Sequence, residues 1–167
     1  MKAIDILTLT ADNIDHEHVG CALPSGSRDP AASKKSWMKQ EFLHGYRMKR
    51  FDIRGKVLLE YTPAEYAWAP IDAPGYLFLD CFWVSGRYQG HGYARRLLET
   101  AIADAKAEGR CGLVAISSDR KRPFLSDPGF YRHMGFRLAD RAAPYFELIY
   151  LPFDEDADTP AFRACAR

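Results

Sequence analysis

The chain has 167 residues, a length typical of one domain with its own hydrophobic core. Its 23 basic and 22 acidic side chains leave a net charge of +1, so no overall field favours nucleic acid or an anionic membrane as a partner. The sequence has no apolar signal-peptide core and no run approaching the ~18 apolar residues of a membrane span. These features predict a soluble, cytoplasmic protein without a nucleic-acid or membrane partner.

The cysteines are far apart and form no Cys-x-x-Cys pair, which predicts reduced thiols in a chain of this length. Cys81 and Cys111 lie inside apolar runs and are expected to be small core residues. His16, His18 and Cys21 fall within one short stretch and could supply zinc ligands, but a further ligand is not evident. We therefore expect no bound metal.

The first half of the chain is predicted to contain a strand, helices and a hairpin. Alternation over residues 3–9 indicates a strand, and the capping residues of "TADN" favour a short helix directly after it. A loop-like stretch, 24–36, overlaps the start of an apolar helical pattern over 32–46. Residues 46–61 then resemble two strands around a tight turn at Arg54-Gly55.

The second half alternates strands with helices. "GYLFLDCFWV", residues 75–84, is apolar on both faces except for Asp80, as expected of a central strand covered on two sides. An apolar stripe from Ala94 to Ala105 predicts an amphipathic helix that Gly109 ends. Residues 112–118 are predicted to form a strand, residues 126–136 a short helix and residues 144–153 a final strand. The tail, residues 153–167, is predicted to lie outside the core.

The junction between the central strand and the amphipathic helix, "VSGRYQGHGYARR", has the composition of an anion site. Unpaired N–H groups at a helix start point at whatever lies there, and the helix dipole favours negative charge. The phosphate loop of NTPases requires Gly-Lys-Ser/Thr, whereas this loop offers His91-Gly92-Tyr93. A dinucleotide fingerprint is also a poor match, since "GHGYAR" ends in Arg95 and lies in the middle of the chain.

The loop does fit the pattern Arg/Gln-x-x-Gly-x-Gly/Ala, here "RYQGHG" at residues 87–92. About forty residues later, "GFYRHMGF" places Tyr131 four residues before the Gly of Gly135-Phe136. These two motifs, in this order and with a strand between them, resemble the GNAT superfamily of N-acetyltransferases over roughly residues 75–151. An ordinary strand-to-helix turn with core aromatics is the alternative.

The resemblance implies an α/β (α+β) fold with a mixed, mostly antiparallel sheet flanked by helices and split between 76–84 and 112–118. It implies an acyl-CoA-dependent acyltransferase domain at residues 1–152, with acetyl-CoA as the acyl donor. The residues after 150 also resemble the junction in a bacterial subgroup that continues into a thioredoxin-like domain, which suggests a single-domain relative or a shortened product. The residues implied to bind the donor are Phe82, Trp83, Val84, Arg87, Tyr88, Gln89, Gly90, His91, Gly92 and Tyr93.

Two side chains are candidates for acid–base catalysis. An alkyl ammonium has a pKa near 10, so a base must remove its proton before attack, and Asp80 is the charged residue of the central strand. Asp80 could equally bind a neighbouring group or attract the cationic substrate, and Glu60 and Glu65 are second candidates. By the resemblance, Tyr131 protonates the departing thiolate, whereas core packing is its structural alternative.

The acceptor is an amine of unknown identity, and a homodimer is compatible with the sequence. No Cys or Ser has an evident nucleophile setting, which favours direct attack of the amine on the thioester. A non-catalytic acyl-CoA sensor is the alternative function. The basic run "DRKRP", 119–123, could meet the 3′-phosphate of coenzyme A or form a solvated turn. The candidates for the acceptor pocket are Trp37, Trp68, Trp83, Tyr61 and Tyr66, with core packing favoured for Trp83.

Overall fold

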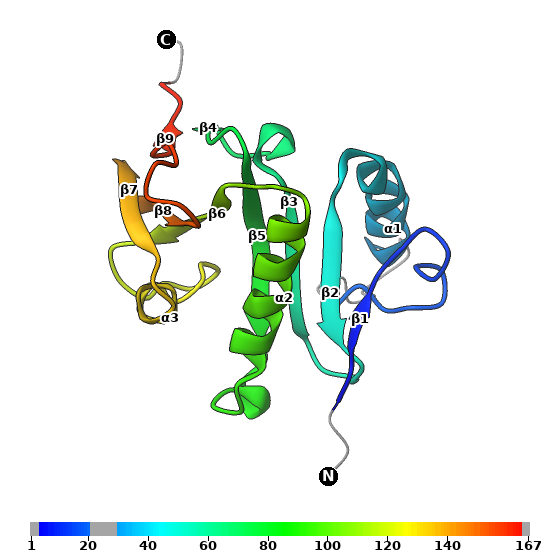
Figure 1. Ribbon diagram of the computed structural model, residues 1–167. Helices are drawn as coiled ribbons and strands as arrows, with labels where there is room; N and C mark the ends of the chain where they lie inside the picture. The colour runs from blue at the N-terminus through cyan, green and yellow to red at the C-terminus, as the bar shows by residue number, and fades with distance from the viewer. Residues whose placement is uncertain (1–3, 21–29, 165–167) are drawn as a thin grey trace.

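Seven strands form the main sheet of the protein, in the order β1-β2-β3-β5-β6-β8-β7. The structure is a computed structural model that describes residues 4–20 and 30–164. Among the described strands of this sheet, only β5 and β6 pair in parallel and every other neighbouring pair is antiparallel, so the predicted mixed, mostly antiparallel sheet is confirmed (Figure 1). The strands are β1 (Ile6–Thr8), β2 (Arg47–Phe51), β3 (Val57–Pro63), β5 (Tyr76–Val84), β6 (Gly112–Ser118), β7 (Arg137–Ala142) and β8 (Phe146–Pro152).

Helices cover both faces of this sheet. The amphipathic stripe predicted around residues 94–105 lies on α2 (Tyr93–Ala107), which crosses in front of β3 and β5 in Figure 1. The short helix α3 (Pro128–His133) begins where its sequence allows, with Pro128 in the first turn and Asp127 as N-cap. The remaining helical segments are α1 (Pro30–Glu41) and the 3₁₀ turns Phe42–His44, Ala64–Tyr66 and Gly86–Tyr88.

The core is divided by the sheet because successive strand residues point to opposite faces. Leu59 and Leu77 pack with Leu98 of α2 and with Tyr131 of α3 in one cluster. On the other face, Leu58 packs with Met38 of α1, and a further cluster contains Phe78, Val114 and Leu148. The central strand β5 is therefore covered on both sides, as its continuous apolar run predicts.

The sheet splits beside β5, where the sequence predicted. Parallel pairing runs only from Tyr76–Leu79 against Gly112–Ala115, although both strands continue further. At the same level, the register with β3 shifts between Leu59 and Tyr61, so that Glu60 faces the stretch 80–81. Such a bulge inserts an extra residue into one strand and bends it. We call the diverging ends of β5 and β6 the split.

Several local expectations differ from the structure. Residues 11–17 form turns rather than a helix, because the Asn13 side chain accepts from the Thr10 amide (2.9 Å) and donates to the Thr8 carbonyl (2.9 Å). The helix expected over 32–46 ends at Glu41 and continues as a 3₁₀ turn.

The segment after residue 153 packs more closely on the domain than expected. Within it, β9 (Ala161–Phe162) pairs with β4 (Ile71–Asp72) in a small second sheet. The Tyr76 hydroxyl donates to the Asp158 carbonyl (2.6 Å), and Pro160 is buried. Both contacts are distant in sequence, so no local pattern of the tail announces them.

Within the described ranges, no helix combines the length and apolar character that a bilayer crossing requires.

Candidate active site

Two cavities of about 580 Å³ each open at the split, one on each face of the sheet. The α2 cavity lies on the side of α2 and α3 and is lined by the end of β5, by residues 88–95 and by residues 121–134. The Trp68 cavity lies on the opposite face, between β5, β6 and the β9 segment. Both cavities include Phe82, Trp83 and residues 124–126 in their lining. A ligand in one cavity can therefore meet a ligand in the other at the split.

The glycine loop turns the chain from β5 into α2 beside the first cavity. Gly90 and Gly92 have φ of +78° and +79°, a region that side chains with a Cβ rarely adopt. A Cβ added at either residue would meet no protein atom within 4 Å, so both backbones face open space. No side chain caps α2, which leaves its first N–H groups available to an anion.

Most of the predicted donor-binding residues line the α2 cavity. Gln89 also shapes the loop, since its side-chain amide donates to the Val84 carbonyl (3.1 Å). Arg87 and His91 are not among the lining residues; the Arg87 guanidinium instead donates to the Tyr88 hydroxyl (2.6 Å) and lies 4.7 Å from the ring centroid. The predicted residues that do line it are Phe82, Trp83, Val84, Tyr88, Gln89, Gly90, Gly92 and Tyr93.

Sequence reasoning missed the wall of this cavity that faces the glycine loop. Arg95 and His133 line it from α2 and α3, with Arg95 hydrogen-bonded to the His133 ring (3.3 Å). The basic run 119–123 contributes Lys121 and Arg122. The sequence signals for this wall were that basic run and the motif "GFYRHMGF", which contains His133 but did not single it out.

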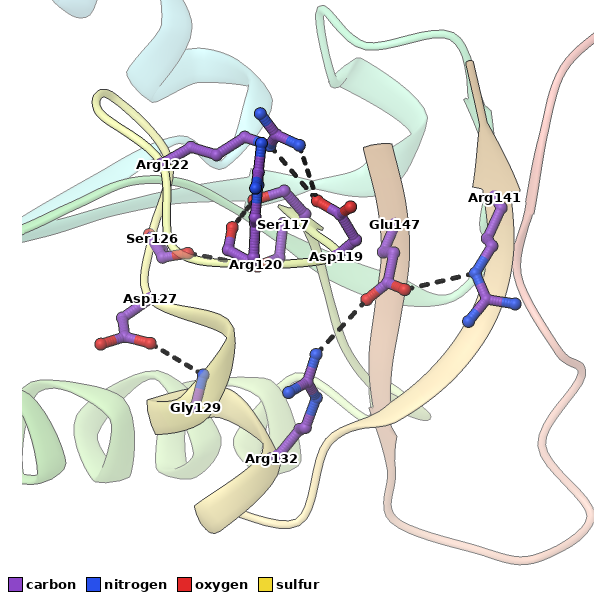
Figure 2. Close-up of polar contacts among 11 residues, drawn as sticks. Ser117, Asp119, Arg120, Arg122, Ser126, Asp127, Gly129, Arg132, Arg141 and Glu147 are labelled. Atoms are coloured by element: carbon purple, nitrogen blue, oxygen red, sulfur yellow. Dashed lines mark hydrogen bonds and ion pairs between the residues drawn. The ribbon is translucent and has the colours of Figure 1, made fainter. Parts of the chain in front are cut away.

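The loop between β6 and α3 is held at both of its ends. The Ser117 hydroxyl donates to the Ser126 carbonyl (3.2 Å), and the Gly129 amide donates to the Asp127 carboxylate (2.8 Å), as Figure 2 shows. Between these ends, Arg122 donates to Asp119 (2.9 Å) and stacks on a tyrosine ring. We call residues 119–127 the pinned loop.

Tyr131 is buried in the core cluster on the α2 side of the sheet. Its ring lies 6.2 Å from that of Phe82 and 4.8 Å from that of Phe136, and the side chain is 2% exposed. Burial raises the pKa of the phenol to about 12, partly offset by a hydrogen bond with Ser126, and nearby Cys81 raises it further. Tyr131 is therefore a neutral hydrogen-bond donor at ordinary pH, close to the split but outside the lining of either cavity.

Asp80 lines the Trp68 cavity, and its carboxylate is oriented by an indole. The Trp68 Nε1–H donates to Asp80 Oδ1 (2.8 Å), although the Trp68 side chain is 73% exposed. Burial raises the pKa of Asp80, the Trp68 hydrogen bond opposes that rise, and the charge of Glu60 adds to it. A carboxyl with a raised pKa, placed in a cavity at the split, has the properties of a general base.

The other carboxylates proposed for this role are engaged elsewhere. Glu60 is buried, accepts from Lys34 (2.5 Å) and the Tyr46 hydroxyl (2.7 Å), and lines neither cavity. Glu65 binds Arg110 (3.1 Å) at the surface. Of the carboxylates considered, only Asp80 faces a cavity.

Of the aromatic candidates for the acceptor pocket, some line a cavity and others are engaged elsewhere. Trp68 and Trp83 line the Trp68 cavity, and Trp83 is 47% exposed rather than packed in the core. Tyr61 is buried under α2, where its hydroxyl donates to an aspartate. Trp37 and Tyr66 lie outside both linings, against Tyr46 and His44 respectively.

The thiols and histidines of the described residues were the candidates for a metal site. Cys81 and Cys111 form no disulfide with one another and are half-buried at the edges of core clusters. The His18 ring contacts the Ile53 carbonyl (3.0 Å), and Cys21 lies outside the described residues. Among the residues that the structure describes, no group of three or more metal-binding side chains converges.

Comparison with known proteins identifies the family. A family model described as an acetyltransferase (GNAT) domain matches residues 54–138, just over half of the 167 residues. The uncharacterized N-acetyltransferase YoaP of Bacillus subtilis (strain 168) is 46% identical over 159 residues, which cover 95% of this chain and 63% of YoaP. The chain belongs to the GNAT acetyltransferase family, and it spans less than two thirds of the length of this relative.

Solved structures show the same fold. An acetyltransferase of the GNAT family from Staphylococcus aureus Mu50 is similar with a TM-score of 0.61 and 14% identity, covering 91% of this chain and 100% of that one. A GNAT family acetyltransferase from Brucella melitensis, in complex with acetyl-CoA, gives a TM-score of 0.54 and 17% identity, covering 97% of each chain. At these identities the similarity concerns the fold alone.

Proposed function

We propose that this chain is an N-acetyltransferase that moves an acetyl group from acetyl-CoA directly to an amine. The observation that carries the proposal is the pair of cavities that meet at the split. A two-substrate transfer needs the thioester carbon and the attacking nitrogen within contact distance. Two cavities that reach the split from opposite faces of the sheet meet this requirement.

The α2 cavity has the chemistry to hold the donor. Gly90 and Gly92 leave backbone amides uncovered at the start of a 15-residue helix, a suitable site for the pyrophosphate. Beyond Leu79, the edge of β5 that faces β6 pairs with no strand of the described residues, which leaves this edge for the pantetheine amides, although the Val84 carbonyl already accepts from Gln89. The acetyl-CoA complex of the Brucella melitensis relative supports this choice of donor.

Asp80 and Tyr131 are proposed to move the protons. Asp80 accepts a proton from the ammonium group, directly or through water, and the neutral amine attacks the thioester carbon. A β5 backbone amide near Phe82 to Val84 stabilises the oxyanion of the tetrahedral intermediate. As the C–S bond breaks, the Tyr131 hydroxyl gives its proton to sulfur. The nitrogen loses its remaining ammonium proton, which restores the Tyr131 hydroxyl through water, and Asp80 releases its proton to solvent. The products are an amide and the free thiol of coenzyme A.

The test is thiol release from acetyl-CoA in the presence of a panel of amines, with the acetylated product identified by mass. Amine-dependent thiol release with matching product is expected for at least one acceptor. Acetyl-CoA binding without turnover on any amine would favour the acyl-CoA sensor function.

A further inference from the structure

We infer that the acceptor is a primary amine carried on an apolar, aromatic group, and not a polycation. This inference rests on the proposed function and names the substrate class of the same site. It starts from the composition of the Trp68 cavity, whose walls are aromatic side chains from separate segments of the chain. They include Trp68, Phe78, Trp83, Phe124, Phe146 and Phe162.

Two of the aromatic side chains that border the cavity are largely exposed to solvent rather than packed against the protein. Trp68 is 73% exposed and Phe124 is 95% exposed, and both border the cavity. Large apolar side chains at the rim of a cavity lose contact with water when an apolar ligand enters, which favours binding of a ligand that covers them.

Phe124 is also held in an unfavourable conformation. Its φ is +67°, in the left-handed region that residues with a Cβ avoid. Hydrogen bonds hold both ends of the pinned loop that carries it, including the one from Ser117 to Ser126 (Figure 2). Phe124 borders both cavities and is 95% exposed, so it lies at their shared rim. Backbone strain of this kind is typical of residues placed for a ligand rather than for packing.

The charges of the cavity select for a single ammonium group. Among the described residues that line it, Asp80 and Arg163 are the charged ones. One carboxylate, oriented by the Trp68 indole, can pair with one ammonium group. A second cation on the same molecule would meet apolar walls and the Arg163 guanidinium, so polyamines and aminoglycosides are disfavoured.

The first test compares acceptors in the thiol-release assay with acetyl-CoA. We expect kcat/KM for 2-phenylethylamine to exceed that for spermidine and for kanamycin by about 100-fold, because the ring fills an apolar cavity. Propylamine, which keeps the ammonium group and lacks the ring, should be slower than 2-phenylethylamine by at least about tenfold. Faster turnover of spermidine or kanamycin would overturn the inference and leave the proposed function intact.

The second test locates this preference in the cavity. The readout is the ratio of kcat/KM for 2-phenylethylamine to kcat/KM for propylamine, because an effect on the chemical step changes both values equally and cancels. Trp68→Ala and Phe124→Ala should each lower this ratio by about fivefold to tenfold. Trp37→Ala and Leu43→Ala are matched controls, since these residues are 43% and 86% exposed and line neither cavity. Phe124→Ala decides the question if Trp68→Ala fails to fold. An unchanged ratio in the folded variants would refute the assignment.

A binding measurement separates this inference from the proposed function. If no amine releases thiol although acetyl-CoA binds, the proposed transferase activity is wrong. Quenching of tryptophan fluorescence by 2-phenylethylamine then still tests the cavity, because Trp68 and Trp83 both border it. Saturable quenching that spermidine does not produce is expected, and its absence contradicts the inference.

Discussion

The α2 cavity and the Trp68 cavity flank the same split, yet the chain builds them differently. The glycine-loop half of the α2 cavity comes from one continuous stretch, residues 82–95. The Trp68 cavity combines residues from β5, β6, the stretch 142–146 and the β9 segment. A site built from one stretch leaves a short-range motif in the sequence, whereas a site built from distant segments does not. The glycine-loop lining of the α2 cavity could therefore be predicted from the sequence as a unit. For the Trp68 cavity the sequence offered only separate candidates such as Asp80 and Trp68.

The largest expected effect belongs to the acceptor side. Asp80→Asn keeps the size of the side chain but removes the base, so kcat near pH 7 should fall by about 10³-fold. The dissociation constant for acetyl-CoA should stay near wild type, because Asp80 lines only the Trp68 cavity. The deficit should shrink at high pH, where more of the amine is already neutral. Loss of folding in this variant would point to a structural role for Asp80.

The next effect concerns Tyr131, whose ring packs near that of Phe82. Tyr131→Phe removes only the hydroxyl, and kcat should fall by about 10²-fold with acetyl-CoA binding unchanged. Since the pKa of Tyr131 is raised to about 12, the phenol stays protonated through the ordinary assay range and should cause no alkaline loss of activity below that pH. Turnover close to wild type, measured where chemistry limits the rate, excludes Tyr131 as the general acid.

Gly90→Val tests the donor side by itself. In the wild type, acetyl-CoA at 100 times its dissociation constant should stabilise the fold by about 2.7 kcal/mol. The valine side chain would occupy the open space beside Gly90, where we expect the donor pyrophosphate to bind, and the residue would have to adopt a φ of +78°. The variant should therefore lose most of that ligand-induced stabilisation. Gly86→Ala is the matched control, because its added Cβ also meets open space and no positive φ is involved. Equal ligand-induced shifts in melting temperature for wild type and Gly90→Val would contradict the loop assignment.

The smallest effect tests how the acceptor side orients its base. Trp68→Phe keeps an aromatic wall and removes the N–H that donates to Asp80. That hydrogen bond opposes the rise caused by burial, so its loss should raise the pKa of Asp80 further. Because a base acts only when ionised, the acidic limb of the kcat/KM profile should move to higher pH. The loss should reach no more than about tenfold at acidic pH and vanish at alkaline pH. A uniform loss across the pH range would argue for lost substrate contact instead.

The elements that the sequence predicted correctly are those whose evidence is local. The hairpin around Arg54-Gly55, the apolar run of β5 and the stripe of α2 each arise from side chains that repeat along a single segment. The strand β7 went unpredicted because it lies at the sheet edge, where "RLADRA" at 137–142 is largely exposed and carries little apolar signal.

The sequence by itself determined the family resemblance, the position of the split beside β5 and most of the glycine-loop side of the α2 cavity. Only the tertiary structure showed that Trp68 orients Asp80, that Phe124 borders both cavities and that the β9 segment closes the Trp68 cavity. Contacts between segments so far apart depend on how the elements pack, and packing is set by the whole core at once rather than by any short run of residues.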